Sequence, residues 1–120
     1  MELNVYDLPG LRVAEGPPGQ PLMRQVSAVI SILEVCFEHR VRALILYPEN
    51  LTERFFDLSS GEAGEILQKL RNFNIRLAVI GSPELRLSSR FGELLADEQR
   101  GPYFRLLDTR AAAQEWLAAS

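Results

Sequence analysis

Two serines, Ser59 and Ser60, stand directly before Gly61 at the predicted start of a helix, and their type and position suit chemistry at that point. A serine hydroxyl there accepts a hydrogen bond from a free backbone amide, and a phosphate attached to it would meet the positive end of the helix dipole. Ser59 and Glu62 also have the spacing of a capping box. The segment therefore predicts a helix cap, which alone accounts for the spacing, or a phosphorylation site.

Carboxylates gather around the same helix start. Asp57, Glu62 and Glu65 could together hold Mg²⁺ or act in acid–base chemistry. Each also has a local role, because acidic groups stabilise a helix N-terminus and Glu65 is spaced to pair with Lys69. We favour these local roles. Gly64, inside the predicted helix, indicates close packing against a strand or a partner, and the alternative is close approach of a ligand.

A second group of polar residues follows two predicted buried strands. Glu49 and Asn50 come after the strand at 41–47, and Ser82 follows the strand at 75–81. Open α/β sheets bind ligands at the carboxyl ends of their parallel strands. Glu49, Asn50, Asp57 and Ser82 are therefore the candidates for an enzyme or a small-ligand site.

Other catalytic signatures are missing from the sequence. His39 is the only histidine and Cys36 the only cysteine, and they are predicted to be a solvated or C-capping residue and a buried thiol. No nucleophile–base pair, glycine-rich phosphate loop or metal-ligand motif can be identified. We expect no cofactor and no metal, and we favour a protein that is not an enzyme.

The composition excludes several classes of protein. The chain has 120 residues, 47% of them hydrophobic and 24% charged, which is typical of one soluble domain. A net charge of -3 lacks the basic footprint of a nucleic-acid-binding protein, and no apolar run is long enough to span a membrane. The N-terminus shows no secretory signal, so we expect a cytoplasmic protein.

Hydrophobic periodicity predicts alternating strands and helices. A hairpin occupies residues 2–14, a helix 22–39, a strand 41–47, a short helix begins at Asn50, and a longer helix runs over 60–73. A strand at 75–81, a helix capped by Ser88 or Ser89, a strand at 103–107 and a helix capped by Asp108 or Thr109 follow. This order predicts a single α/β domain over residues 1–120, with a mixed sheet of about five strands and four main helices.

The order of elements resembles the STAS domain of sulfate transporters and anti-sigma-factor antagonists. In that family a buried strand leads to Asp-Ser-Ser-Gly at a helix start; here the strand is 44–46 and residues 57–61 read Asp-Leu-Ser-Ser-Gly. The strand at 77–80 leading to Ser82 is also similar. The resemblance implies that Ser60, just before Gly61, is a phosphate acceptor and that the domain binds a regulatory partner.

A closer resemblance is to a small bacterial family of unknown function. Residues 55–58 read Phe-Phe-Asp-Leu, residues 63–69 read Ala-Gly-Glu-Ile-Leu-Gln-Lys, and the strand at 76–81 completes the pattern. This family implies a fold but no activity.

From the sequence we expect a STAS-like regulatory or interaction module whose working surface is residues 55–64, including Gly61 and Glu62, with Ser60 or Ser59 phosphorylated. Its partner is expected to be a protein or a second copy of the chain, and neither nucleic acid nor a membrane. The alternative is a small enzyme or ligand-binding protein. A pocket of a few hundred Å³ with converging polar groups would favour the alternative; a flat apolar surface beside Ser60 would favour the module.

Overall fold

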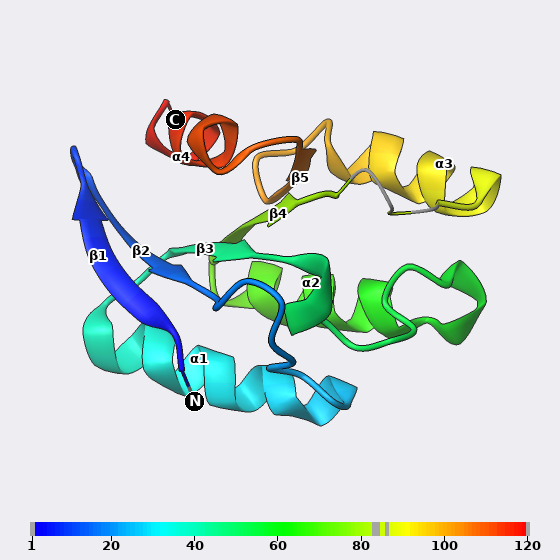
Figure 1. Ribbon diagram of the computed structural model, residues 1–120, viewed down its shortest axis with the longest axis horizontal. Helices are drawn as coiled ribbons and strands as arrows, with labels where there is room; N and C mark the ends of the chain where they lie inside the picture. Colours follow the sequence, from blue (N-terminus) through cyan, green and yellow to red (C-terminus); the bar gives the residue numbers. More distant parts are fainter. Residues whose placement is uncertain (1, 83–84, 86, 120) are drawn as a thin grey trace.

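Five strands form one mixed sheet whose spatial order, β1 to β5, is also their order along the chain (Figure 1). The computed structural model describes residues 2–82, 85 and 87–119. The strands are β1 (Asn4–Leu8), β2 (Leu11–Glu15), β3 (Ala43–Leu46), β4 (Arg76–Ile80) and β5 (Phe104–Leu107). β1 and β2 pair antiparallel as the predicted hairpin, and β2 to β5 are parallel. The predicted mixed sheet is therefore confirmed.

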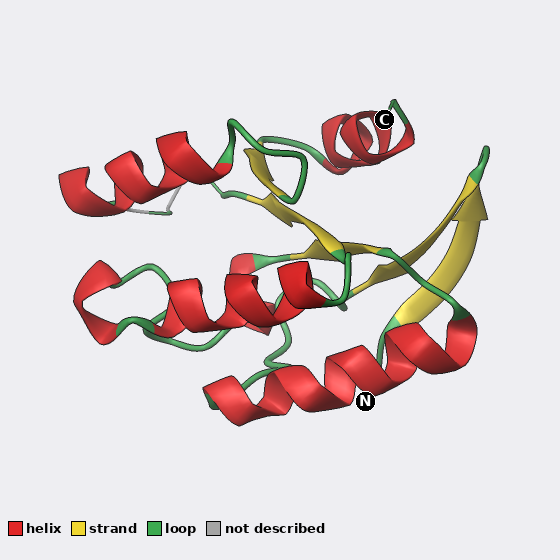
Figure 2. Ribbon diagram, turned by 180° about the vertical axis from the view of Figure 1, so that it is seen from behind, coloured by secondary structure: helices red, strands yellow, loops and turns green. Residues whose placement is uncertain are grey.

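Four α-helices in the described residues cover the two faces of this sheet unequally (Figure 2). They are α1 (Val29–His39), α2 (Glu62–Asn72), α3 (Ser89–Glu98) and α4 (Arg110–Ala118). Sequential parallel strands joined by right-handed crossovers place the connecting helices on one face, and α1, α2 and α3 share a core there. α4 follows the last strand and packs on the other face. None of these helices is long and apolar enough to cross a membrane.

The alternation of side chains along β3 shows how one strand serves both cores. Leu44 and Leu46 face the three-helix core, whereas Ala43 and Ile45 face α4. All four are completely buried. A strand buried on both faces reads as an unbroken apolar run, which explains why β3 and β4 are recognisable in the sequence.

The helix predicted over 22–39 begins later than expected. A 3-10 turn, η1 (Val26–Ala28), leads into α1, and Met23 is buried in the preceding loop. Ile30 and Phe37 are about half exposed, at 50% and 54%. The buried face of α1 is Val29, Ile32, Leu33 and Cys36.

The prediction of a short helix that starts at Asn50 is wrong. A 3-10 turn, η2 (Pro48–Asn50), ends at this residue instead, and a second one, η3 (Leu58–Ser60), follows after a stretch of turns. The reason is the direction of the Asn50 side chain, whose Oδ1 accepts a hydrogen bond from the preceding Tyr47 amide at 2.7 Å. The caps predicted for the later helices are confirmed: Ser88 caps α3 and Thr109 caps α4.

Candidate functional site

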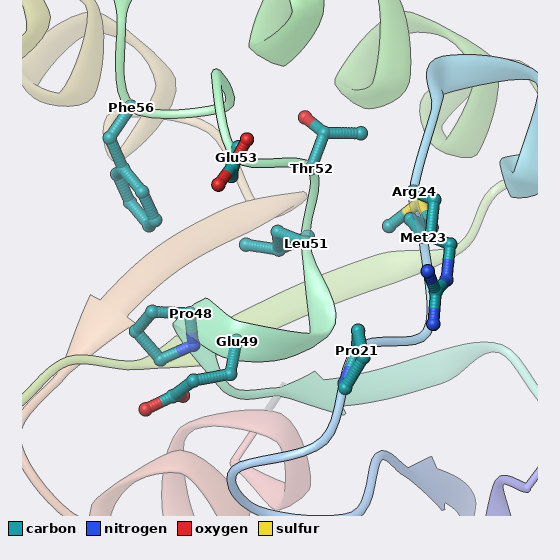
Figure 3. A pocket seen from close by; sticks show the side chains of 9 residues that line it. All are labelled: Pro21, Met23, Arg24, Pro48, Glu49, Leu51, Thr52, Glu53 and Phe56. Carbon is teal, nitrogen blue, oxygen red and sulfur yellow. The ribbon is translucent and has the colours of Figure 1, made fainter.

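A hollow in the described part of the chain lies where β3 leaves the sheet (Figure 3). The loop that follows β2 forms one wall and the segment around η2 forms the other. The volume is about 480 Å³. The lining residues are Pro21, Met23, Arg24, Pro48, Glu49, Leu51, Thr52, Glu53 and Phe56. A volume of a few hundred Å³ at the carboxyl end of a parallel strand is typical of small-molecule sites.

Asn50 ties the two walls of this pocket together. Its side-chain Nδ2 donates hydrogen bonds to the backbone carbonyl oxygens of Pro17 and Gln20, each at 2.8 Å. The backbone carbonyl of Asn50 accepts a hydrogen bond from the Met23 amide at 2.8 Å. The residue is completely buried. Asn50 was a ligand candidate in the sequence, but its side-chain amide is already occupied by the backbone that it holds in place.

Gly16 lets the loop come close enough for these bonds. A Cβ added at this position would overlap the side-chain amide of Asn50 and approach Leu46. The Gly16 amide donates to the carbonyl of Ile45 at 2.9 Å, which continues the sheet for one residue beyond β2. The prolines that follow restrict the loop further. This wall of the pocket is therefore fixed by close backbone approach.

The pocket combines an apolar base with separated charges. Leu51 and Met23 are buried, and Phe56 is half-buried. Figure 3 shows the carboxylates of Glu49 and Glu53 on one side of the pocket and the guanidinium of Arg24 on the opposite side. No ion pair or hydrogen bond joins these three side chains to another described side chain. All three charges are therefore available to a ligand.

Thr52 has an unusual polar atom behind the pocket lining. The residue is 3% exposed, and among the described residues its Oγ1 is the buried side-chain oxygen or nitrogen that lacks a hydrogen-bond partner. Buried hydroxyls are nearly always paired, because leaving one unpaired costs about 1–3 kcal/mol. In Figure 3 this hydroxyl points away from the other lining side chains, so it belongs to the interior of the wall and is not presented to a ligand.

The predicted site residues do not converge on one place. Glu49 lines the pocket just described, whereas Ser82 lines a separate hollow of about 260 Å³ with Gly81 and Asp108. Asp57 and Ser59 line a third cleft, of about 460 Å³, that is completed by the start of α3. The enzyme candidates Glu49, Asp57 and Ser82 thus lie in three different hollows.

The serine segment is held by its own hydrogen bonds. Asp57 accepts from the backbone amide of Ser59 at 3.1 Å and from its hydroxyl at 2.6 Å, and the hydroxyl bond lowers the pKa of the Asp57 carboxyl. The Ser60 hydroxyl lies 2.7 Å from the carbonyl oxygens of Arg54 and Asp57, and it accepts from the Glu62 amide at 3.2 Å. The prediction of a capping box between Ser59 and Glu62 is wrong. Asp57 caps η3 instead, and the Glu62 amide donates to the Ser60 hydroxyl.

Gly61 is the N-terminal boundary of α2, which begins at Glu62. Its φ of 73° is in the left-handed region, which glycine adopts without strain. Gly61 is exposed, so this turn into the helix faces solvent. Gly64 is also exposed, and a Cβ there would meet nothing within 4 Å, so the close packing predicted for it is wrong.

The third cleft contains groups that favour an anion. Besides Asp57, Leu58 and Ser59, it is lined by Ser88, Ser89 and Arg90 at the start of α3. Arg90 is exposed. The surface beside the serines is therefore a cleft with both polar and apolar lining, and it differs from the expected surface because it is not flat. In the described residues no three His, Cys, Asp or Glu side chains gather as a metal site.

A polar network that the sequence analysis missed lies on the α4 face. The Glu15 carboxylate, 7% exposed as a residue, accepts hydrogen bonds from the hydroxyls of Tyr6 and Tyr47. The Arg110 Nε donates to both Glu15 oxygens at 2.9 Å, and Gln114 donates to the Tyr6 hydroxyl. Burial and the bond to Glu15 raise the pKa of Tyr47 to about 12. The network joins β1, β2 and α4 to Tyr47, which directly follows β3.

The remaining nucleophile does not contribute to a site. Cys36 is 1% exposed on the buried face of α1, and burial raises the pKa of its thiol to about 11. A thiol with such a pKa is protonated at neutral pH and reacts poorly. The prediction of a buried thiol is therefore confirmed.

The fold and the pocket define an α/β domain with a candidate ligand site at the end of β3. The chain belongs to a family described as a domain of unknown function, DUF4180, whose model matches residues 9–117. The expected membership of a small family of unknown function is thus confirmed. Searches of curated proteins and of solved structures gave no match.

Proposed function

We propose that this domain binds a small molecule with an apolar body in the pocket at the end of β3. The observation that carries the proposal is the pocket of about 480 Å³ itself, which combines the buried Leu51 and Met23 with three charged side chains that have no partner among the described residues. Apolar walls with a few polar groups are what small-ligand sites require. The fixed loop at Gly16 and Asn50 means that the pocket is formed before the ligand arrives.

Binding rather than turnover suits the residues in the lining. The nine lining residues include no His, Cys or Lys, and no described base contacts the Thr52 hydroxyl. Without a base in contact, a threonine hydroxyl is a poor nucleophile. Glu49 and Glu53 are exposed, which leaves them suited to attract a ligand charge.

The test is a fragment screen followed by NMR on ¹⁵N-labelled protein. Binding in the pocket is expected to shift the amide signals of Leu51, Thr52 and Glu53. The proposal is wrong if no fragment shifts these amides.

A second candidate function is the phosphorylation-dependent interaction module that the STAS resemblance implies. It is supported by the cleft that places the exposed Ser59 with Arg90 at the start of α3. A phosphate on Ser59 could pair with Arg90 and with the amides of that helix start. Ser60 is less open to a kinase, because its residue is half-buried and its hydroxyl contacts two backbone carbonyls.

This second candidate is tested by intact-mass measurement of protein isolated from its native host, with and without phosphatase. We expect a phosphorylated fraction that disappears in Ser59→Ala and persists in Ser60→Ala. Absence of phosphate under every growth condition would remove the candidate and leave ligand binding untouched.

A further inference from the structure

We propose that a second copy of this chain docks on a surface formed by α1 and the end of α2, in a dimer with two-fold symmetry. The residues of this surface, the α1–α2 face, are Ile30, Glu34, Phe37, Arg40, Arg42 and Phe73. The inference goes beyond the proposed ligand binding, because none of these residues lines the pocket at the end of β3. It follows from exposed apolar side chains, from the charges beside them and from the backbone conformation of Arg40.

Exposed apolar side chains gather on the α1–α2 face. Four large hydrophobic side chains are exposed in the described part of the chain, and three of them, Ile30, Phe37 and Phe73, lie here, each about half exposed. The rings of Phe37 and Phe73 pack edge-to-face with their centroids 5.2 Å apart. Ile30 precedes Phe37 by two turns and therefore lies on the same side of α1. Single exposed apolar residues are normal, but a group of them marks an interaction surface.

The aromatic pair stands where both helices end. α1 and α2 lie next to each other on one face of the sheet and share its core (Figure 2). Phe37 is in the last turn of α1, and Phe73 directly follows α2. The pair borders a hollow of about 310 Å³ that is also lined by Arg40 and Arg42, both exposed. The hollow gives a ring from a second copy a place to insert.

Charges of both signs follow one another along this face in a self-complementary order. Helical spacing places Glu34 between Ile30 and Phe37 on the same side of α1, and Arg40 and Arg42 come after Phe37. None of these three charged side chains is within ion-pair distance of an opposite charge in the described residues.

This order of charges selects a second copy as the partner. When a two-fold axis passes near Phe37, α1 of the second copy runs antiparallel to α1 of the first. Each Glu34 then faces Arg40 of the other copy, on either side of the aromatic side chains. A face with charges of one sign would repel its own copy, whereas this one attracts it.

The backbone at Arg40 supports a contact made by its side chain. Its φ of 58° is in the left-handed region, which glycine or asparagine usually occupies at the end of a helix. Asn74 has the same φ after α2. The dipole of α1 favours a positive charge at this end, but a residue with ordinary backbone conformation would provide that charge without strain. An arginine here is explained when the guanidinium binds a group of a second copy.

The experiment is sedimentation velocity over a series from micromolar to millimolar protein. The parent protein is expected to show a monomer–dimer equilibrium, and Phe37→Ser should weaken it about ten-fold or more, as for an aromatic residue at the centre of an interface. Arg40→Gly should weaken it about five-fold. Because glycine adopts a positive φ without strain, this variant should have a monomer Tm no lower than that of the parent protein, so its weaker association cannot come from unfolding.

Charge reversal tests the two-fold arrangement itself. Glu34→Arg and Arg40→Glu should each weaken self-association about ten-fold or more, because each places like charges together at two symmetric contacts. Mixing the two variants should restore association as a heterodimer, in which each reversed side chain meets an opposite charge. Native mass spectrometry identifies the heterodimer by its mass. Glu93→Arg, which changes an exposed glutamate of α3 that has no ion pair in the described residues, is the matched control and should associate like the parent protein.

Each part of the inference has its own contrary result. A parent protein that stays monomeric up to millimolar concentration would overturn the dimer and leave the α1–α2 face to a different partner. Dimerisation that Phe37→Ser and both charge reversals leave unchanged would overturn the assignment of this face. Failure of the mixed variants to associate would overturn the two-fold pairing of Glu34 with Arg40. Fragment binding in the pocket at the end of β3 is independent of all three results.

Discussion

Glu15 and Thr52 are both polar residues buried in this domain, and their surroundings are opposite. The Glu15 carboxylate, on the α4 face, is bonded by Tyr6, Tyr47 and Arg110. The Thr52 hydroxyl, in the pocket at the end of β3, has no partner in the described residues. A polar group that is fully paired holds elements together, whereas one that is left unpaired costs free energy of unfolding.

This difference predicts opposite effects on stability. The Glu15 network brings together residues of β1, β2 and α4 with Tyr47, which directly follows β3. The Thr52 hydroxyl has no such partner among the described residues. Substitutions that remove the polar group should therefore lower the free energy of unfolding at Glu15 and raise it at Thr52.

The largest effect is expected from Glu15→Ala. Removing the carboxylate leaves the two phenols and the guanidinium without their shared acceptor, so the free energy of unfolding should fall by about 3 kcal/mol. Urea unfolding followed by circular dichroism measures the change. Glu15→Gln, which keeps one acceptor oxygen, should lose less. A loss below about 0.5 kcal/mol for Glu15→Ala would show that the network contributes little to stability.

Gly16→Ala tests how closely the loop after β2 approaches Asn50 at the pocket wall. The added methyl group would overlap Asn50, and displacing that side chain should lower the free energy of unfolding by about 2 kcal/mol. Gly64→Ala is the matched control, because it adds a methyl group in open space on α2 and should stabilise the protein by about 1 kcal/mol. Thermal unfolding of both variants tests this. Equal changes for the two variants would contradict the close approach at Gly16.

Tyr47→Phe tests the pH dependence of the Glu15 network. At neutral pH the variant loses one bond to a carboxylate and should be less stable by about 1.5 kcal/mol. The pKa of Tyr47 is raised from 10.0 to about 12, so its stabilising effect is complete below pH 10 and is lost as the pH rises toward 12. The stability gap between parent and variant, measured by urea unfolding at pH 8 and pH 11, should therefore narrow. A constant gap would contradict the raised pKa.

The smallest expected effect is a gain in stability rather than a loss. Thr52→Val removes the unpaired hydroxyl at nearly constant volume, so the free protein should gain about 1 kcal/mol of stability, or about 4 °C in Tm. Differential scanning calorimetry without added ligand measures the gain. A lower Tm would mean that the hydroxyl already has a partner, and the contrast with Glu15 would then disappear.

The sheet and its helices were largely predictable because they depend on local patterns. β3 and β4 are unbroken apolar runs, and Ser88 and Thr109 are caps with the expected spacing. The errors occur where a side chain acts over a distance. Asn50 was predicted to cap a helix that follows it. Its side-chain amide instead donates to the carbonyl oxygens of Pro17 and Gln20, which lie 33 and 30 residues earlier in the chain.

The candidate site was predictable only in part. Glu49 follows a buried strand, and that rule placed it in the pocket. Thr52 and Arg24 carry no local signal, because the pocket exists only when the loop after β2 is held against η2. Glu15 was equally hidden, since its partner Arg110 lies 95 residues away.

The Glu15 network also bears on how the chain folds during synthesis. Its members extend from Tyr6 to Gln114, so it cannot close until α4 has emerged from the ribosome. The three-helix face can form earlier, because its helices connect successive strands. Until then Val13, Ile45 and Ile80 on the opposite face are exposed to solvent, because α4 is the helix that buries them. The nascent chain therefore exposes an apolar sheet surface until α4 docks, and this is the interval in which a chaperone would be most useful.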